Sequence, residues 1–184
     1  HLKGGSEYVE LDHPVQIAVK QASEETTGES SPGYGIDGCS APNFAMSLHG
    51  LGRAMAFYAS AHERSDVRSK AAARLTDAMR KHPELLAGEG RACTELMRAM
   101  DGRVSIKTGA EGVFIAIVPE KKIGIALKIA DGATRASECV MASLLVRVGV
   151  LDPHHPAARA RIHAPIHNRR GIHAAGVRPA AALA

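Results

Sequence analysis

The chain has 184 residues, of which 45% are hydrophobic and 23% charged, a composition typical of one globular domain with a sizeable core. No apolar run approaches the roughly 20 residues that a membrane-spanning helix requires, so the sequence predicts no membrane partner. The three cysteines are widely spaced and odd in number, which argues against a disulfide framework and for a reducing, cytoplasmic setting.

The net charge of +4 conceals two chain ends of opposite sign. Residues 1–40 carry two basic and seven acidic side chains, a balance of −5, whereas residues 153–184 carry five arginines and no acid. A basic tail can bind nucleic acid. This tail has no Phe, Tyr or Trp to stack on bases and no recognised nucleic-acid motif, so no nucleic-acid partner is expected.

The first predicted helix follows the segment "LDHP". Pro14 suits the first position of a helix, and Val15, Val19 and Ala22 form one apolar stripe before Gly28 ends it. The next ten residues, "ESSPGYGIDG", indicate a loop.

Longer periodic segments follow this loop. Apolar residues at helical spacing, with Ser40 as the N-cap, predict a helix from about Ala41 to His62. Further helices are predicted after a Ser65 cap as far as Lys81, and over Ala92–Met100.

The pattern then changes to the alternation typical of strands. The segments "RVSIKTG", "VFIAIVP" and "IGIALKI" predict three antiparallel strands, with a turn at "PEKK". A nearly all-apolar helix over Thr134–Val148 is expected to cover the sheet, and an edge strand is predicted near Arg161–Ile166. The expected fold class is α/β (α+β): a single domain, residues 1–184, in which helices pack on a mainly antiparallel sheet.

Gly33, Gly35 and Gly38 have the G-x-G-x-x-G spacing of a dinucleotide-binding loop. That loop must follow a strand, open a helix and precede an acidic residue by about 20 positions. Here "TTGESSP" precedes the glycines, and the residue 20 positions on is Tyr58. The glycines are therefore interpreted as turn residues.

Asp37 and Cys39 lie just before the predicted helix start at Ala41. A helix N-terminus lowers the pKa of a thiol, so Cys39 is a candidate nucleophile or soft metal ligand, and Asp37 a candidate for orienting a substrate amine. The alternative is a buried, inert cysteine beside a loop-capping aspartate. Spacing alone leaves both interpretations open.

Lys107 is a second candidate, because it lies on a predicted strand beside Gly109, which permits close backbone approach. A partly desolvated lysine can act as general base for a serine or threonine nucleophile; the alternative is a solvated strand lysine. The triplet K-T-G also occurs in β-lactamases and penicillin-binding proteins, which need an S-x-x-K motif as well. None of the twelve serines here has Lys three residues later.

The histidine pairs His154/His155 and His163/His167 could indicate a metal site. Pro156 and Pro165 argue against the regular helix that would bring an i,i+4 pair together. We therefore expect exposed tail histidines.

Several segments together resemble one family, the rhizobial-type L-asparaginases, also called the asparaginase II or thermolabile type. They occur in the family's order and at its separations, and they span nearly the whole chain. The segments are "HPVQ", "GIDGCSAPNFA", Cys93, "KTGAEGVF", "IGIALKIADGATRASE" and "NRRGIHAAGVRPA".

The resemblance implies an amidohydrolase that converts L-asparagine to L-aspartate and ammonia. It implies a fold similar to serine β-lactamases and glutaminases, a homodimer, and Ser–Lys pairs beside a zinc site of two cysteines and a lysine. By motif match, Lys107 is the general-base lysine of one pair, and Asp37 lies at the substrate and metal site. Cys39 is a zinc ligand, and Cys93 lies near the site without binding the metal.

The departure from the family pattern is at the N-terminal side. Family members carry a further portion before "HPVQ", with the S-x-x-K motif, the serine partner of the K-T-G lysine and a C-S-G-K-H segment. We therefore expect this chain to correspond to the C-terminal part of such an enzyme and to be inactive alone. The alternatives are an inactive remnant or partner subunit, and a glutaminase-like or β-lactamase-like serine hydrolase.

Overall fold

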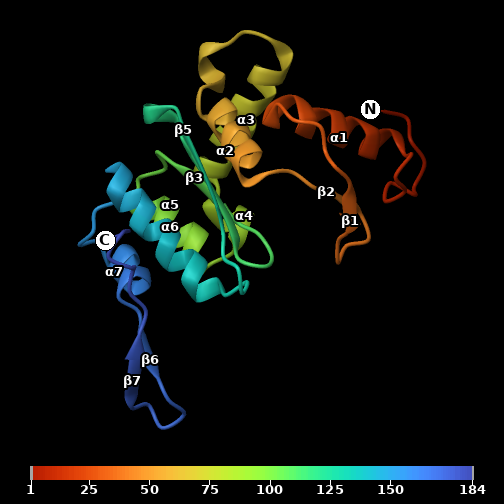
Figure 1. The fold of residues 1–184 in the computed structure, drawn as a ribbon. Helices are drawn as coiled ribbons and strands as arrows, with labels where there is room; N and C mark the ends of the chain where they lie inside the picture. The colour runs from red at the N-terminus through yellow and green to blue at the C-terminus, as the bar shows by residue number, and fades with distance from the viewer. Residues whose placement is uncertain (1, 184) are drawn as a thin grey trace.

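A computed structural model describes residues 2–183 (Figure 1). Its centre is an antiparallel sheet in the spatial order β3-β4-β5, and two short two-stranded ribbons lie apart from it. The strands are β1 (Tyr34–Ile36), β2 (Pro42–Phe44), β3 (Ser105–Thr108), β4 (Val113–Val118), β5 (Ile123–Lys128), β6 (Pro165–His167) and β7 (His173–Gly176). The α/β class with antiparallel strands is confirmed.

Helices cover both faces of the sheet. They are α1 (Pro14–Thr27), α2 (Leu48–Ala59), α3 (Val67–Lys81), α4 (Pro83–Ala87), α5 (Ala92–Ala99), α6 (Thr134–Val148) and α7 (Pro156–Ile162). Two short 3-10 turns also occur, at Ala61–Glu63 and Pro119–Lys121. The described residues contain no helix both long and apolar enough to cross a membrane.

The main core lies between one face of the sheet and the helices α5, α6 and α7. Alternation along β4 directs Phe114, Ala116 and Val118 into this core, where each is fully buried. Leu96 and Met141 meet them from α5 and α6. The core is thus built mainly from aliphatic and methionine side chains, as the scarcity of aromatic residues predicts.

The opposite face of the sheet is covered by α2 and α3. Ser105 on β3 is fully buried and donates a hydrogen bond to the Thr76 carbonyl of α3 at 3.1 Å. Gly124 on β5 lies directly against the backbone of α2, near Gly52 and Ala56. The missing side chain at Gly124 is what allows the helix to lie this close to the strand.

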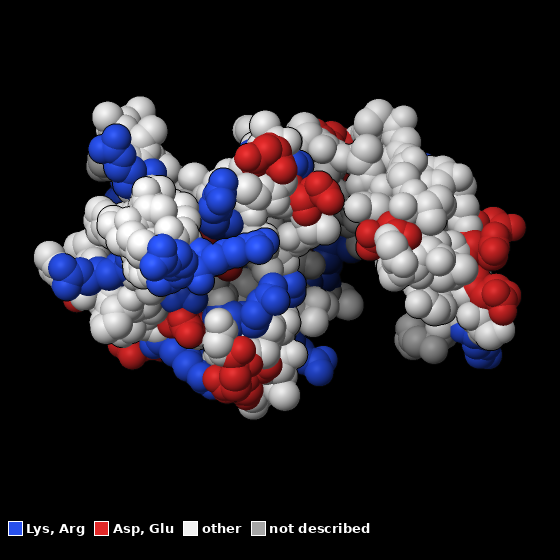
Figure 2. Space-filling model, turned by 90° about the horizontal axis from the view of Figure 1, so that it is seen from below, with Lys and Arg blue, Asp and Glu red and all other residues white. Residues whose placement is uncertain are grey.

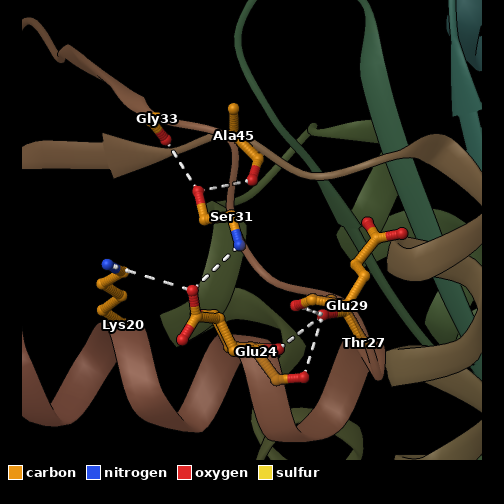
Figure 3. Close-up of polar contacts among 8 residues, drawn as sticks. Lys20, Glu24, Thr27, Glu29, Ser31, Gly33 and Ala45 are labelled. Atoms are coloured by element: carbon orange, nitrogen blue, oxygen red, sulfur yellow. Dashed lines mark hydrogen bonds and ion pairs between the residues drawn. The ribbon is translucent and has the colours of Figure 1, made fainter.

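Residues 2–47, here called the arm, extend from this body and contain α1 and the β1–β2 ribbon (Figure 1). Polar contacts hold the arm together (Figure 3). The Ser31 backbone N–H donates to Glu24 at 2.9 Å, and the Ser31 hydroxyl bonds to the carbonyls of Gly33 and Ala45 at 2.7 and 2.8 Å. None of the arm residues belongs to either hydrophobic cluster of the described chain.

The predicted helix over Ala41–His62 is wrong in its first part. Residues 42–44 form β2, and α2 begins only at Leu48. Ser47 is its N-cap, because its hydroxyl accepts the Gly50 N–H at 2.8 Å. Ser40 cannot be this cap, since its φ of +71° places it in the left-handed region.

Other boundaries also differ from the sequence-based expectation. The loop "ESSPGYGIDG" contains β1, and α3 is capped by Asp66 rather than Ser65. The edge strand predicted near Arg161–Ile166 is wrong in its first half, where α7 continues to Ile162, and β6 pairs with β7 instead of joining the central sheet. The helix over Thr134–Val148 and the three central strands are confirmed.

The Gly124 crossing predicts a strong steric effect. A Cβ atom at this position would clash with the Ala56 nitrogen and the Gly52 carbonyl oxygen, and would lie 2.6 Å from the Met55 carbonyl carbon. We expect Gly124→Ala to lower the free energy of unfolding by about 1–3 kcal/mol or more, measured by urea denaturation. The matched control is Gly52→Ala, whose Cβ would meet nothing within 4 Å; equal losses in both variants would contradict the steric account.

The junction between arm and body predicts a pH dependence. Glu29 accepts the Ser47 N–H at 2.5 Å and the Ser47 hydroxyl at 2.8 Å, and these bonds hold the pKa of Glu29 below its ordinary value of 4.5. A lowered folded-state pKa stabilises the protein above the unfolded-state pKa, and this stabilisation is lost as the pH falls through the folded-state pKa.

The chain should therefore be more stable than Glu29→Gln at pH 7, and the difference should shrink below about pH 4.5. Urea unfolding at pH 7, 5, 4 and 3 measures it. A difference between the two proteins that stays constant over this range would contradict the role of the carboxylate charge.

Candidate functional site

Lys107 and Cys93 lie together at the outer edge of β3. Cys93 of α5 is only 1% exposed, and its Sγ accepts the backbone N–H of Thr108 at 3.3 Å. Lys107 is half-buried, and its Nζ donates to the Thr108 carbonyl at 2.6 Å. β4 pairs with one edge of β3, and no strand within residues 2–183 pairs with the other edge.

The surroundings of Cys93 favour a neutral thiol. Burial raises the pKa of Cys93, and the Thr108 N–H and the positive charges of Lys107 and Arg91 oppose this increase without cancelling it. Thiolate is the form that attacks carbonyls and binds metals. Cys93 is therefore suited to packing within the core, and its expected place near a catalytic site stays a prediction.

Asp37 and Cys39 occupy the turn of the β1–β2 ribbon, where both are exposed. The Asp37 N–H donates to the Ala41 carbonyl at 3.0 Å and the Ser40 N–H to the Asp37 carbonyl at 2.8 Å. With Ser40 in the left-handed region, this is a three-residue hairpin loop. The Cys39 thiol donates to Asp37 Oδ2 at 3.6 Å.

The position expected for Cys39 at a helix N-terminus is therefore wrong. The next helix begins at Leu48, after the whole of β2 and a connecting segment. The ribbon turn supplies neither the dipole nor the free N–H groups of a helix start to Cys39. No helix N-terminus therefore activates the Cys39 thiol.

The structure thus brings together two of the four sequence-predicted site residues. Among residues 2–183, no hydrogen bond or ion pair connects Asp37 or Cys39 with Lys107 or Cys93. The β1–β2 ribbon stands away from β3 (Figure 1). The roles expected for all four residues remain predictions, and the arrangement of residues 2–183 alone places them in two separate groups.

Sequence reasoning missed an ionic group beside Cys93. Arg161 of α7 has an 11% exposed side chain and lies 2.5 Å from Glu95 and 3.9 Å from Glu138. It joins α5, α6 and α7 behind Cys93, and Glu138 is one of the charges that act on this thiol. Sequence patterns could not reveal this group, because Glu95, Glu138 and Arg161 lie far apart in the chain and share no local spacing.

A comparison with protein-family models identifies L-asparaginase II over residues 3–179. The chain belongs to the L-asparaginase II family. A search of curated proteins found no match. The family match spans nearly the whole chain and confirms the relationship indicated by its motifs, and it supports an asparaginase-type amidohydrolase with a small-molecule substrate.

The zinc expected of such an L-asparaginase requires a donor set that this chain does not assemble. Zinc sites in proteins use three or four protein ligands. Within residues 2–183 no three His, Cys, Asp or Glu side chains lie close enough together to hold a metal ion. Among the candidate histidines, His155 is the N-cap of α7, because its Nδ1 accepts the Ala157 N–H at 3.1 Å. The residues present therefore do not fit the expected zinc site, and no metal-dependent step is assigned to them.

The contrast among the cysteines gives a direct prediction. Cys39 is exposed, whereas Cys93 and Cys139 are buried and burial raises both of their pKa values. In the native protein at pH 8, a chromogenic disulfide reagent should react rapidly with one thiol, and the other two should react only after unfolding. Cys39→Ser should remove the rapid phase and Cys139→Ser should preserve it; two rapid thiols would contradict the described burial.

Proposed function

We propose that this chain takes part in hydrolysing the side-chain amide of L-asparagine to L-aspartate and ammonia, with Lys107 as the proton-transfer group. One observation carries the proposal: the amino group of Lys107 lies on the edge strand β3, and its one side-chain hydrogen bond within residues 2–183 is to the Thr108 carbonyl. Membership of the L-asparaginase II family supports the substrate class.

The proposed chemistry is acyl transfer through a serine. The serine oxygen bonds to the amide carbon as its proton passes to the neutral amine of Lys107. Lys107 then returns this proton to the amide nitrogen, the C–N bond breaks and ammonia leaves. Water next attacks the aspartyl ester, and Lys107 moves the proton back to the serine oxygen. Backbone N–H groups stabilise the oxyanion in both steps.

The proposal assigns the nucleophile to no residue among 2–183. Within residues 2–183, the only hydrogen bond of the Lys107 side chain is to the Thr108 carbonyl, and no serine hydroxyl bonds to its Nζ. Thr108 directs its own hydroxyl to the Gly109 carbonyl at 3.3 Å. The zinc expected from the family resemblance is not part of the proposal, because Cys39 and Asp37 have no third donor.

The same observation favours a second candidate function. A lysine without a serine neighbour, and an aspartate on a separate ribbon, are also what a catalytically inactive subunit would show. Such a chain would act only by associating with another polypeptide. The two candidates differ in whether Lys107 contributes to turnover.

The test measures ammonia released from L-asparagine, with L-glutamine and a chromogenic β-lactam as competing substrate classes. Lys107→Met should reduce kcat for L-asparagine by 10²-fold or more, the usual contribution of a general base. The matched control is Lys128→Met, because Lys128 of β5 donates to the carbonyl of its own next residue at the same 2.6 Å.

Each outcome decides between the candidates. Turnover that is lost in Lys107→Met and kept in Lys128→Met supports the amidohydrolase. No hydrolysis of any of the three substrates, either by the unchanged chain or by the chain mixed with a polypeptide that carries an S-x-x-K motif, supports the inactive subunit. Hydrolysis of L-glutamine or the β-lactam in preference to L-asparagine would overturn the proposed substrate.

A further inference from the structure

Two histidines face each other across the β6–β7 ribbon. His167 of β6 and His173 of β7 are direct partners in the strand pairing. Their ring centroids lie 5.8 Å apart, and the ring planes are inclined at 57°. Both side chains are exposed, as expected for the tail histidines. The sequence pattern paired His167 with His163, whereas the folded ribbon pairs it with His173.

An irregularity in the ribbon produces this pairing. Ile166 pairs with Ala175, so a regular antiparallel ladder would place Ala174 opposite His167. The register shifts between Ile166 and His167, and His173 takes that place instead. Bulges of this kind re-aim side chains and occur often beside functional sites. Here the bulge brings two imidazoles into a directly opposed pair.

The turn between the two histidines is held by Asn168. Its backbone N–H donates to the Ile172 carbonyl at 2.9 Å, and its carbonyl accepts the Gly171 N–H at 2.9 Å. Its side-chain Oδ1 accepts the N–H groups of Arg170 and Ile172 at 2.9 and 3.0 Å. These bonds fix the chain beside both histidines, which lowers the ordering cost of any ligand that binds the pair.

The two rings lie within reach of one metal ion. An imidazole nitrogen binds zinc at about 2.0–2.1 Å, so each ring centroid lies about 3.2 Å from the ion, and two such centroids at most about 6.4 Å apart. The observed 5.8 Å between the centroids falls inside this limit. Exposed side chains change rotamer within nanoseconds, so side-chain rotation is enough to turn both rings toward a common ion.

The donors available in this region select the kind of ion. Residues 153–184 contain five arginines and no acid, so no carboxylate of this segment competes for or completes the site. Acidic side chains gather instead along the arm, on the right of Figure 2, and the arm lies on a different side of the body from the ribbon (Figure 1). Imidazole suits copper, nickel and zinc, whereas magnesium and calcium require oxygen ligands.

We propose that His167 and His173 form a site for a divalent transition-metal ion of the Cu²⁺, Ni²⁺ and Zn²⁺ group, with water completing the coordination sphere. Within residues 2–183 neither imidazole makes a hydrogen bond that an ion would have to displace. The site differs from the zinc site implied by the family resemblance, whose one candidate ligand in this chain, Cys39, lies on the arm.

The consequences follow from the number of ligands and from their place in the fold. Two protein ligands are fewer than the three or four of a structural or catalytic zinc site, so the bound ion should exchange readily. The ion would connect the two strands of a ribbon that is marginally stable alone, so binding should stabilise the β6–β7 pairing.

The test is isothermal titration of the full chain with CuCl₂ and with NiCl₂. His167→Asn and His173→Asn should each weaken the binding of one equivalent of metal by about tenfold or more, because a single imidazole remains. Cu²⁺ should bind more tightly than Ni²⁺, and a large excess of Mg²⁺ should not compete. Asn168→Ala should also weaken binding, because it releases the turn that holds the pair.

Two matched controls make the same substitution at other exposed histidines. His163→Asn removes the other member of the i,i+4 pair, and His154→Asn changes a histidine that precedes α7. Both should bind the ion as the unchanged chain does. Because Cys39 can bind the same ions, nuclear magnetic resonance gives the location: substoichiometric Cu²⁺ should broaden the amide signals of residues 165–176 before those of the arm.

Metal binding should also depend on pH. A histidine must be neutral to bind a metal, so binding should weaken strongly from pH 7.5 to pH 5.5 as the imidazoles become protonated. Arg169 and Arg170 are the charged groups of the turn, and both stay charged over this range, so they do not cause the change.

Three results would overturn the proposal. They are unchanged metal binding in His167→Asn and His173→Asn, an equal loss in His163→Asn or His154→Asn, and Cu²⁺ broadening that begins on the arm and spares the ribbon. Far-UV circular dichroism of each variant confirms folding, so that lost binding is not confused with unfolding. None of these readouts depends on hydrolytic activity.

Discussion

The close crossing of α2 over β5 at Gly124 determines how the rest of the body is arranged. Because α2 lies this near, it covers one face of the three-stranded sheet. Phe114, Ala116 and Val118 of β4 alternate with the residues that face α2, so they point to the opposite face, where α5 and α6 enclose them. The enclosed α5 then brings Cys93 against the Thr108 N–H at the edge of β3. The position of Lys107 is therefore a consequence of packing on both faces of the sheet.

The parts of the fold that depend on local periodicity could be predicted from the sequence. The helix over Thr134–Val148 and strands β3 to β5 follow their hydrophobic patterns because the core selects those patterns. The β1–β2 ribbon could not be predicted in this way. Phe44 fits a helical stripe equally well, and the start of α2 is fixed by the bonds between Glu29 and Ser47, 18 residues apart.

The same distinction between local patterns and long-range contacts applies to the candidate site. The position of Lys107 on a strand could be predicted from the alternation of residues around it. Its contact with Cys93 through Thr108 depends on how α5 packs, which no local signal in the sequence reports. The helix start expected just after Asp37 and Cys39 is wrong, because both residues lie in the turn of the β1–β2 ribbon on the arm.

The arm is held to the body by polar contacts rather than by the hydrophobic core. Its residues belong to no hydrophobic cluster, and polar contacts such as those of Ser31 and Glu29 maintain its shape and its junction with α2. Such contacts contribute only modest net free energy in water, so the arm is the part of the chain most open to stabilisation by a bound polypeptide.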